Sequence, residues 1–164
     1  MEKCKRIMDS VHGYITIPET YCDCILDTPY FQRLRRIEQT SARTLFPSAR
    51  HDRFIHSLGV FYLGFRLCQS LEQKNEGNKY GYPEDWTSVF ESYRLACLLH
   101  DVGHSPFSHT FENFYDDGND NLVNALLTQI SDEQFQEDWK EWIKGSKPHE
   151  IMSAWVAFLY IANL

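Results

Sequence analysis

The stretch that most constrains the fold covers residues 53–73 and reads RFIHSLGVFYLGFRLCQSLEQ. Its apolar side chains return every three or four residues, which is the spacing of one face of an amphipathic helix. This broad apolar face comprises Phe54, Leu58, Val60, Phe61, Leu63, Phe65 and Leu67. The spacing predicts one long helix from about Arg53 to Gln73. Gly59 is expected to let another helix approach this one closely.

Further helices are predicted on both sides of this stretch. Upstream, Asp27-Thr28-Pro29 places a capping residue before proline at the first helical position, so a helix is expected through residues 31–39. Residues 6–19 alternate around a glycine and predict a short hairpin or loop–strand element. Predicted helices downstream cover residues 86–100, 108–115, 121–130, 133–144 and 148 to the chain end. The sequence therefore predicts an all-α domain with one small N-terminal β element.

Length and composition fit a single compact domain over residues 1–164. Of these residues, 43% are hydrophobic and 24% are charged, which suits a sizeable core and argues against global disorder. Five cysteines, with only Cys22 and Cys24 close together, favour reduced thiols in a cytoplasmic protein. The start has no signal-peptide core, and the longest uncharged run, residues 151–164, is too short to span a bilayer. No membrane association is expected.

The charges are distributed unevenly. A net charge of −7 argues against a general nucleic-acid binder, whose surface is basic. Arginines nevertheless gather at positions 33, 35, 36, 43, 50 and 53, against only Glu38 and Asp52. Guanidinium groups match phosphate oxygens, so this arginine belt suggests a local anion site. A solvated helix face is the alternative.

Histidine and aspartate gather in two motifs. His56 lies among apolar neighbours in the long helix, and the pair His100-Asp101 follows the helix predicted at residues 86–100, within LLHDVGHSPFSH at 98–109. Two imidazoles and a carboxylate from two helices could converge on one divalent ion, which would compensate the carboxylate charge. The alternatives are a core histidine at position 56 and a hydrogen-bond network that gives Asp101 another cation.

Together, the two motifs resemble those of the HD-domain superfamily of metal-dependent phosphohydrolases. More narrowly, they resemble deoxynucleoside triphosphate triphosphohydrolases of the dGTPase type and of the type with a sterile alpha motif beside the HD domain. The resemblance rests on HDRFIHSLGV at 51–60 and LLHDVGHSPFSH at 98–109, and it extends to residues 9–17, 26–39 and 149–153. It implies an HD helical bundle that hydrolyses dNTP to deoxynucleoside and triphosphate, by attack of a metal-activated water at the α-phosphate.

The resemblance implies that His56, His100 and Asp101 bind one divalent ion: Mn, Fe, Zn or Ni. Mg²⁺ is a candidate companion of the nucleotide phosphates. The family completes its metal site with a second aspartate far downstream, and the chain stops at Leu164 before such a motif. We therefore expect the N-terminal portion of a dNTPase-like core, incomplete at its C-terminus, with weak metal binding and little hydrolysis on its own.

The resemblance also assigns the proton-transfer residues. His104 would contact a phosphate, and His109 would protonate the departing deoxynucleoside oxygen, because a histidine near neutral pKa can give up a proton there. Glu112 and His149 would support these two imidazoles. Glu112 replaces the aspartate more often found at its position in the family.

Nucleotide contacts are implied as well. Gln39 would recognise the sugar hydroxyl, and Arg53 would hold a phosphate as a bidentate clamp. A guanine-nucleotide activator would bind at a subunit interface of a homo-oligomer. The residues implied for that allosteric site are Lys5, Arg6, Asp27, Gln32 and Arg35.

Two other functions are compatible with these motifs. One is a different HD phosphohydrolase that acts on nucleotides or on single-stranded nucleic acid. The other is a nucleotide-binding or assembly module that is catalytically incomplete. Release of intact triphosphate separates the first alternative from a dNTPase, and nucleotide binding without turnover supports the second.

Overall fold

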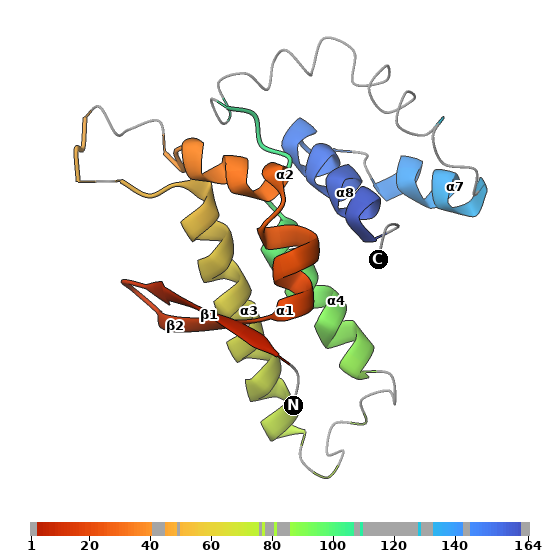
Figure 1. The fold of residues 1–164 in the computed structure, drawn as a ribbon. Helices are drawn as coiled ribbons and strands as arrows, with labels where there is room; N and C mark the ends of the chain where they lie inside the picture. The colour runs from red at the N-terminus through yellow and green to blue at the C-terminus, as the bar shows by residue number, and fades with distance from the viewer. Residues whose placement is uncertain are drawn as a thin grey trace.

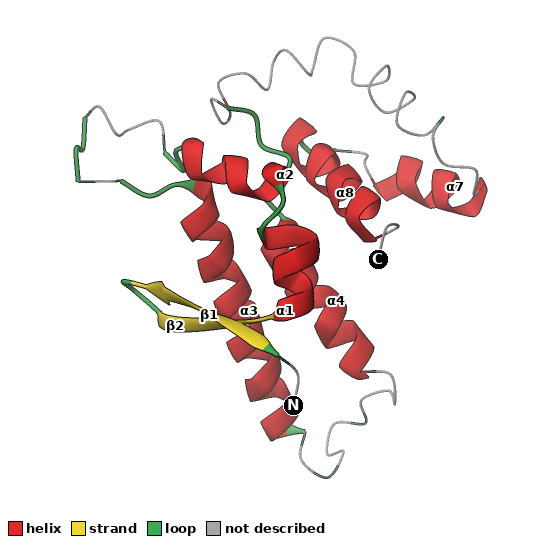
Figure 2. Cartoon of the chain, viewed as in Figure 1, coloured by secondary structure: helices red, strands yellow, loops and turns green. Residues whose placement is uncertain are grey.

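The two longest helices of the domain pack against each other. The structure, a computed structural model, describes residues 3–40, 45–48, 50–75, 77, 81, 86–106, 109, 128, 133–142 and 145–161. Helix α3 (Arg53–Lys74) and helix α4 (Trp86–Leu99) run alongside each other, and the N-terminal elements cover them (Figure 1). Helices dominate the described residues, as Figure 2 shows, so the predicted all-α class with one small β element is confirmed.

The chain begins with a β-hairpin. Strands β1 (Cys4–Asp9) and β2 (Gly13–Pro18) pair antiparallel, which confirms the predicted hairpin. The Asp9 carboxylate accepts hydrogen bonds of 3.0 and 2.8 Å from two backbone N–H groups of the turn. The next strand begins at Gly13, whose φ of +75° is costly for other residues. The hairpin lies against α3 (Figure 1).

A helical segment that the sequence did not predict follows the hairpin. It consists of α1 (Glu19–Tyr21) and the π-helical turn η1 (Cys22–Leu26). Each piece is shorter than the window over which apolar periodicity can be recognised. Ile25 and Leu26 nevertheless belong to the hydrophobic core cluster, together with residues of α3 and α4.

The arginine-rich segment is less helical than predicted. Thr28 caps α2 (Pro29–Gln32), which passes directly into the 3₁₀ turn η2 (Arg33–Arg36). Helical structure ends there instead of continuing to residue 39, because Ile37 is extended and the next residue forms a β-bridge with Asp52. The bridge holds Glu38 beside Asp52, the residue that immediately precedes α3.

Helix α3 confirms the long helix of the sequence prediction, with one additional residue at its C-terminal end. Asp52 caps it by accepting a hydrogen bond from the backbone N–H of Ile55 at 2.8 Å. Its buried face is narrower than predicted, because Leu63 and Leu67 are 56% and 47% exposed.

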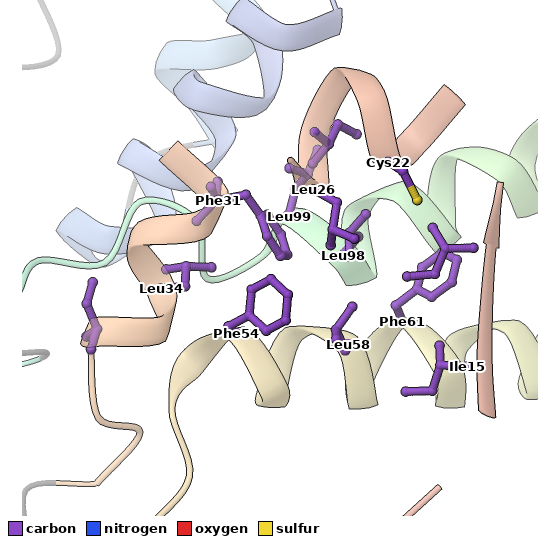
Figure 3. Packing of buried hydrophobic residues seen from close by; sticks show 14 residues of the cluster. Ile15, Cys22, Leu26, Phe31, Leu34, Phe54, Leu58, Phe61, Leu98 and Leu99 are labelled. Atoms are coloured by element: carbon purple, nitrogen blue, oxygen red, sulfur yellow. The ribbon is translucent and has the colours of Figure 1, made fainter. Parts of the chain in front are cut away.

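The hydrophobic core lies where α3 meets η1, α2 and α4 (Figure 3). Phe31 of α2 and Phe54 of α3 pack edge to face, with ring centroids 5.5 Å apart. Leu98 and Leu99 enter from the end of α4 and are almost fully buried. His100 and Asp101 therefore come directly after two core residues in the chain.

The close helix approach predicted at Gly59 is found five residues further along α3, at Gly64. A Cβ atom at Gly59 would lie 3.2 Å from the His12 ring of the hairpin turn. A Cβ atom at Gly64 would lie 2.7 Å from the Cys97 sulfur of α4. The prediction for Gly59 was wrong because its neighbour is a loop side chain.

The last described helices are α7 (Glu133–Trp142) and α8 (Pro148–Ile161). Both were predicted, and residues 143–144 of the helix predicted at 133–144 lie outside the described residues. The helices predicted at 108–115 and 121–130 lie outside the described residues apart from His109 and Thr128. Among the described helices, none combines the length and the apolar character that crossing a membrane requires.

Replacing Gly103 by Ala should destabilise the domain. The added Cβ would lie 2.3 Å from the backbone nitrogen of Ser153, so α8 would have to move away from the turn after α4. We expect a loss of about 1–3 kcal/mol in the free energy of unfolding, measured by urea titration. Gly59→Ala is the matched control, because it meets only a movable side-chain ring. Equal effects of the two substitutions would contradict this packing.

Candidate metal centre

His56, His100 and Asp101 come together although they lie on two different elements. His56 occupies the first turn of α3, and the other two directly follow α4. The Nε2 atoms of the two histidines are 3.2 Å apart. The Asp101 carboxylate oxygens lie 3.6 Å from His56 Nε2 and 3.5 Å from His100 Nε2. Donor atoms of two helices therefore face one small volume.

The protonation of His100 is fixed by its backbone contact. Its Nδ1 lies 2.9 Å from the carbonyl oxygen of Cys97, which can only accept a hydrogen bond, so Nδ1 carries the proton. The neutral ring then presents the lone pair of Nε2 toward His56 and Asp101. Such a backbone partner is typical of metal-binding histidines, because it orients the ring.

These distances fit a metal ion. Two donor atoms that are each about 2.1 Å from one ion, in tetrahedral or octahedral geometry, lie about 3.0–3.4 Å apart. The separation of 3.2 Å between the two Nε2 atoms lies in this range. Each histidine is close to it from a different carboxylate oxygen of Asp101, His100 from Oδ1 at 3.5 Å and His56 from Oδ2 at 3.6 Å. Two imidazole nitrogens and one carboxylate oxygen suit Mn, Fe, Zn or Ni. Without an ion, a proton on His56 Nε2 can bridge to His100.

The side chain of Asp101 is buried, with only 7% of its surface exposed. Its carboxylate is nevertheless ionised in this position. Burial raises the pKa of this carboxyl, but the hydrogen bond from His104 and the positive charge of Arg53 outweigh that effect. The pKa therefore lies well below its ordinary value. Asp101 is anionic at neutral pH, as a metal ligand must be.

Arg53 is the closest charged partner of Asp101. The guanidinium is almost fully buried and donates to Asp101 Oδ2 at 2.7 Å. This contact is part of the hydrogen-bond network that the sequence left open as an alternative. The structure thus pairs Arg53 with the Asp101 carboxylate, and the phosphate clamp at Arg53 stays a prediction.

A cluster of three histidines adjoins Asp101. The rings of His104 and His149 stack with centroids 4.0 Å apart, and His109 lies edge-on to both at 5.0 and 5.1 Å. His104 Nε2 lies 3.3 Å from Asp101 Oδ1. The structure thus brings together three of the four predicted proton-transfer residues. Glu112 lies outside the described residues.

Arg33 is a positioning residue that the sequence analysis did not single out. Its guanidinium donates to the carbonyl oxygens of Val102 at 2.6 Å and His104 at 2.7 Å. These two bonds fix the turn that carries Asp101 and His104. The sequence showed only one more arginine in the belt, because backbone carbonyls leave no motif that could identify such a contact.

Gln39 lies near the start of α3, where its backbone N–H donates to the His51 carbonyl at 3.0 Å. Its side-chain Oε1 is buried and has no hydrogen-bond partner among the described residues. A buried unsatisfied oxygen is unusual and is compatible with a ligand contact. The predicted role in sugar recognition remains a prediction.

Part of the predicted allosteric set forms contacts at the surface. Lys5 donates to Asp27 at 2.8 Å, and this hydrogen bond raises the pKa of Lys5. Arg6 lies over the ring of Tyr14, 5.6 Å from its centroid. Lys5 and Asp27 are thus adjacent, as a shared nucleotide site requires.

Gln32 and Arg35 form a second pair. The amide of Gln32 donates to the Leu26 carbonyl at 2.7 Å, and Arg35 Nε donates to Gln32 Oε1 at 2.8 Å. The Arg35 guanidinium also lies 3.5 Å from the ring centroid of Phe54. Arg35 therefore has a packing role in addition to any nucleotide contact.

Two cavities flank the candidate metal centre. One of about 640 Å³ adjoins His100 and has mostly apolar walls from α4, α7 and α8, including Trp139 and Phe158. The other, of about 290 Å³, lies between the hairpin turn and α3, next to His51 and His56. Both histidines of the centre are therefore reachable from open space.

The stability of the metal-free chain should decrease in mild acid. Burial lowers the pKa of both His56 and His104 below the ordinary value of 6.5. Below pH about 6.5 the unfolded chain then binds more protons than the folded chain. The free energy of unfolding therefore decreases as the pH is lowered. Urea unfolding midpoints, measured in the presence of a chelator from pH 7.5 to pH 5.5, test this expectation. The His104→Gln variant should show a smaller change of midpoint with pH. A midpoint that rises as the pH is lowered to 5.5 would contradict the expected loss of stability.

Residues 53–150 match the HD domain family, and this range contains His56 and the whole motif at 98–109. Deoxynucleoside triphosphate triphosphohydrolase SAMHD1 of Bos taurus is 43% identical over 111 residues, which cover 66% of this chain and 18% of that protein. The SAMHD1 homolog of Dictyostelium discoideum is 39% identical over 115 residues, covering 68% of this chain and 21% of that protein.

A bacterial protein is also similar. The uncharacterized protein YwfO of Bacillus subtilis (strain 168) is 36% identical over 124 residues, which cover 75% of this chain and 27% of that protein. The chain thus spans between 18% and 27% of the length of these three relatives. Because the matched family range covers more than half of the chain, the chain belongs to the HD domain family.

Proposed function

We propose that this chain is a metal-dependent phosphohydrolase that converts dNTP and water to deoxynucleoside and triphosphate. The observation that carries the proposal is the convergence of His56, His100 and Asp101, with donor atoms 3.2–3.6 Å apart, beside three further histidines. The similarity to proteins named deoxynucleoside triphosphate triphosphohydrolase supports the choice of substrate.

In this proposal, His56, His100 and Asp101 hold one ion of Mn, Fe, Zn or Ni. A divalent ion held here would lower the pKa of a bound water and neutralise phosphate charge. Arg53 keeps Asp101 ionised, and the Cys97 carbonyl orients the His100 ring so that its Nε2 faces His56 and Asp101. Arg33 holds the turn that carries Asp101.

The bond that breaks joins the α-phosphorus to the 5′ oxygen, which must gain a proton as it leaves. We assign this proton to His109, because it is exposed and its ring contacts both other histidines of the cluster. His104 is held against Asp101 and would contact a phosphate. His149 stacks on His104 and restricts its rotation.

A catalytically incomplete nucleotide-binding module is the second candidate. The ion pair between Arg53 and Asp101 favours it, because the carboxylate already has a cation. A different HD phosphohydrolase would share the metal centre and differ in its products. Product identity therefore separates all three functions.

The test is an incubation of the metal-loaded chain with a dNTP in ¹⁸O-labelled water, followed by mass analysis of the products. We expect only a small amount of product, because the sequence analysis predicts little hydrolysis by this chain on its own. That product should be unlabelled deoxynucleoside and triphosphate with one ¹⁸O, because water attacks phosphorus. Orthophosphate or pyrophosphate as the first product would indicate a different phosphohydrolase. Nucleotide binding without any product after metal loading would support the module.

We also propose that the chain forms a homo-oligomer through the segment from Asp27 to Arg35, and that a guanine nucleotide strengthens it. Asp27 can accept from the donor edge of guanine, and Lys5 and Arg35 add positive charge for its phosphates. Sedimentation should show a larger species with GTP or dGTP, and Asp27→Ala should remove this response. A monomer under both conditions would contradict the proposal.

A further inference from the structure

The larger of the two described cavities has aromatic walls. It encloses about 640 Å³ between α4, α7 and α8. Cavities of about 300–1,000 Å³ with mostly apolar walls are typical binding sites of small organic ligands. Three of the wall residues are aromatic: Trp139 and Trp142 of α7 and Phe158 of α8. Among the described lining residues, His100 is the one that the cavity shares with the candidate metal centre.

The two tryptophans form a pair at the wall of this cavity. They are three residues apart on α7, so they lie on the same side of the helix. Their ring centroids are 5.5 Å apart, and the ring planes are inclined at 45° to each other. Trp139 is buried, whereas 57% of Trp142 is exposed. The face of an aromatic ring carries partial negative charge, so two inclined rings beside one cavity attract a cation.

The charge at the cavity wall is negative. Glu150 is the only ionised side chain among the described residues that line it, because His100 is neutral and none of them is a lysine or arginine. Glu150 Oε2 accepts a hydrogen bond from the backbone N–H of Lys147 at 2.7 Å. Ser146 Oγ donates to the Trp142 carbonyl at 3.3 Å. These short-range contacts hold the carboxylate near the end of α7 that carries Trp142.

The surroundings of the cavity are acidic as well. Helix α7 carries four acidic residues and one lysine, and the whole chain has a net charge of −7. This potential disfavours an anionic ligand and attracts an organic cation. A primary ammonium is strongly hydrated, so its transfer to a mostly apolar cavity is costly. A weakly hydrated cation is therefore the better match for these walls.

We propose that this cavity binds a quaternary ammonium compound with an apolar or aromatic body. The cationic head would lie against the rings of Trp139 and Trp142, with Glu150 as its counter-ion. The body would lie along Phe158 and the alanines of α8 that line the cavity. Aromatic side chains recognise quaternary ammonium groups in this way in other proteins. The site goes beyond the proposed hydrolysis, because it uses neither a metal ion nor a phosphate contact.

The experiment is calorimetric titration of the full chain, in chelator, with two probes of the same shape. One probe is 4-(trimethylammonio)benzyl alcohol, and the other is 4-tert-butylbenzyl alcohol, in which carbon replaces the charged nitrogen. We expect the cation to bind about 2–30-fold more tightly than the neutral probe, which is the range of a cation–π contact. Trp142→Leu should reduce this preference, because leucine keeps an apolar wall without an aromatic face.

Glu150→Gln tests the counter-ion. It should weaken binding of the cation about two- to fivefold, the range of a partly exposed ion pair, and leave the neutral probe unaffected. The glutamine oxygen can still accept the hydrogen bond from the Lys147 N–H. Glu137→Gln is the matched control, because it makes the same charge change on α7 at a residue that does not line the cavity. Far-UV circular dichroism verifies that each variant folds.

The outcomes either support or overturn the site. A preference for the cation that decreases in Trp142→Leu and in Glu150→Gln, but not in Glu137→Gln, supports it. Absence of a preference overturns it. A preference that either variant leaves unchanged, or that decreases as much in the control, also overturns it. The titration contains neither metal nor dNTP, so its failure leaves the proposed hydrolysis intact, and failed hydrolysis leaves this site intact.

Discussion

An Asp101→Asn variant is expected to lose its bound metal, and with it any hydrolysis of dNTP. The substitution removes the only carboxylate of the His56–His100–Asp101 centre. It also leaves Arg53, which is 1% exposed, as a buried cation without its anion. Loss of one partner of a buried ion pair costs about 3–5 kcal/mol, so the free energy of unfolding should fall by a similar amount. Metal analysis and urea unfolding measure the two effects.

The double variant Asp101→Asn/Arg53→Met separates metal loss from unfolding. Methionine removes the unpaired charge while filling much of the same space, so most of the lost stability should return. The metal should remain absent, because the ligand is still missing. Metal content equal to that of the unaltered chain, in this double variant or in His100→Ala, would show that the ion binds elsewhere.

A His109→Ala variant is expected to lower dNTP turnover by about 10²–10⁴-fold, the range for a lost general acid. The ion at the His56–His100–Asp101 centre should stay bound, because His109 is not among its ligands. The effect should be much smaller for a substrate whose leaving group is acidic enough to depart without a proton. Steady-state rates of both substrates with one metal equivalent per chain measure this. Equal losses on the two substrates would assign His109 a binding role instead of proton donation.

The parts of the fold that could be predicted are those with long regular patterns. The 22 residues of α3 have an apolar spacing that only a helix satisfies, and Pro148 marks the start of α8. By contrast, η1 has five residues and no readable period, although Ile25 is completely buried. The end of η2 is set by the bridge between Glu38 and Asp52, which is a tertiary contact.

The convergence of His56, His100 and Asp101 could be predicted because these residue types are rare in apolar surroundings. A carboxylate two residues after the buried Leu99 needs a partner, and two histidines were available in the motifs. The partner that the structure adds is Arg53, which the sequence analysis had assigned to a phosphate. Whether the Arg53 side chain points to a bound phosphate or to the Asp101 carboxylate depends on packing, which no local sequence pattern encodes.

Anomalous diffraction from crystals of the metal-loaded chain tests the central claim most directly, because it locates the ion without assuming its ligands. The highest anomalous difference peak, recorded at the absorption edge of the metal used, should lie within coordination distance of His56 Nε2, His100 Nε2 and the Asp101 carboxylate. A highest peak at another position, with no density between these three side chains, would contradict the assignment of this site as the metal centre of an HD phosphohydrolase.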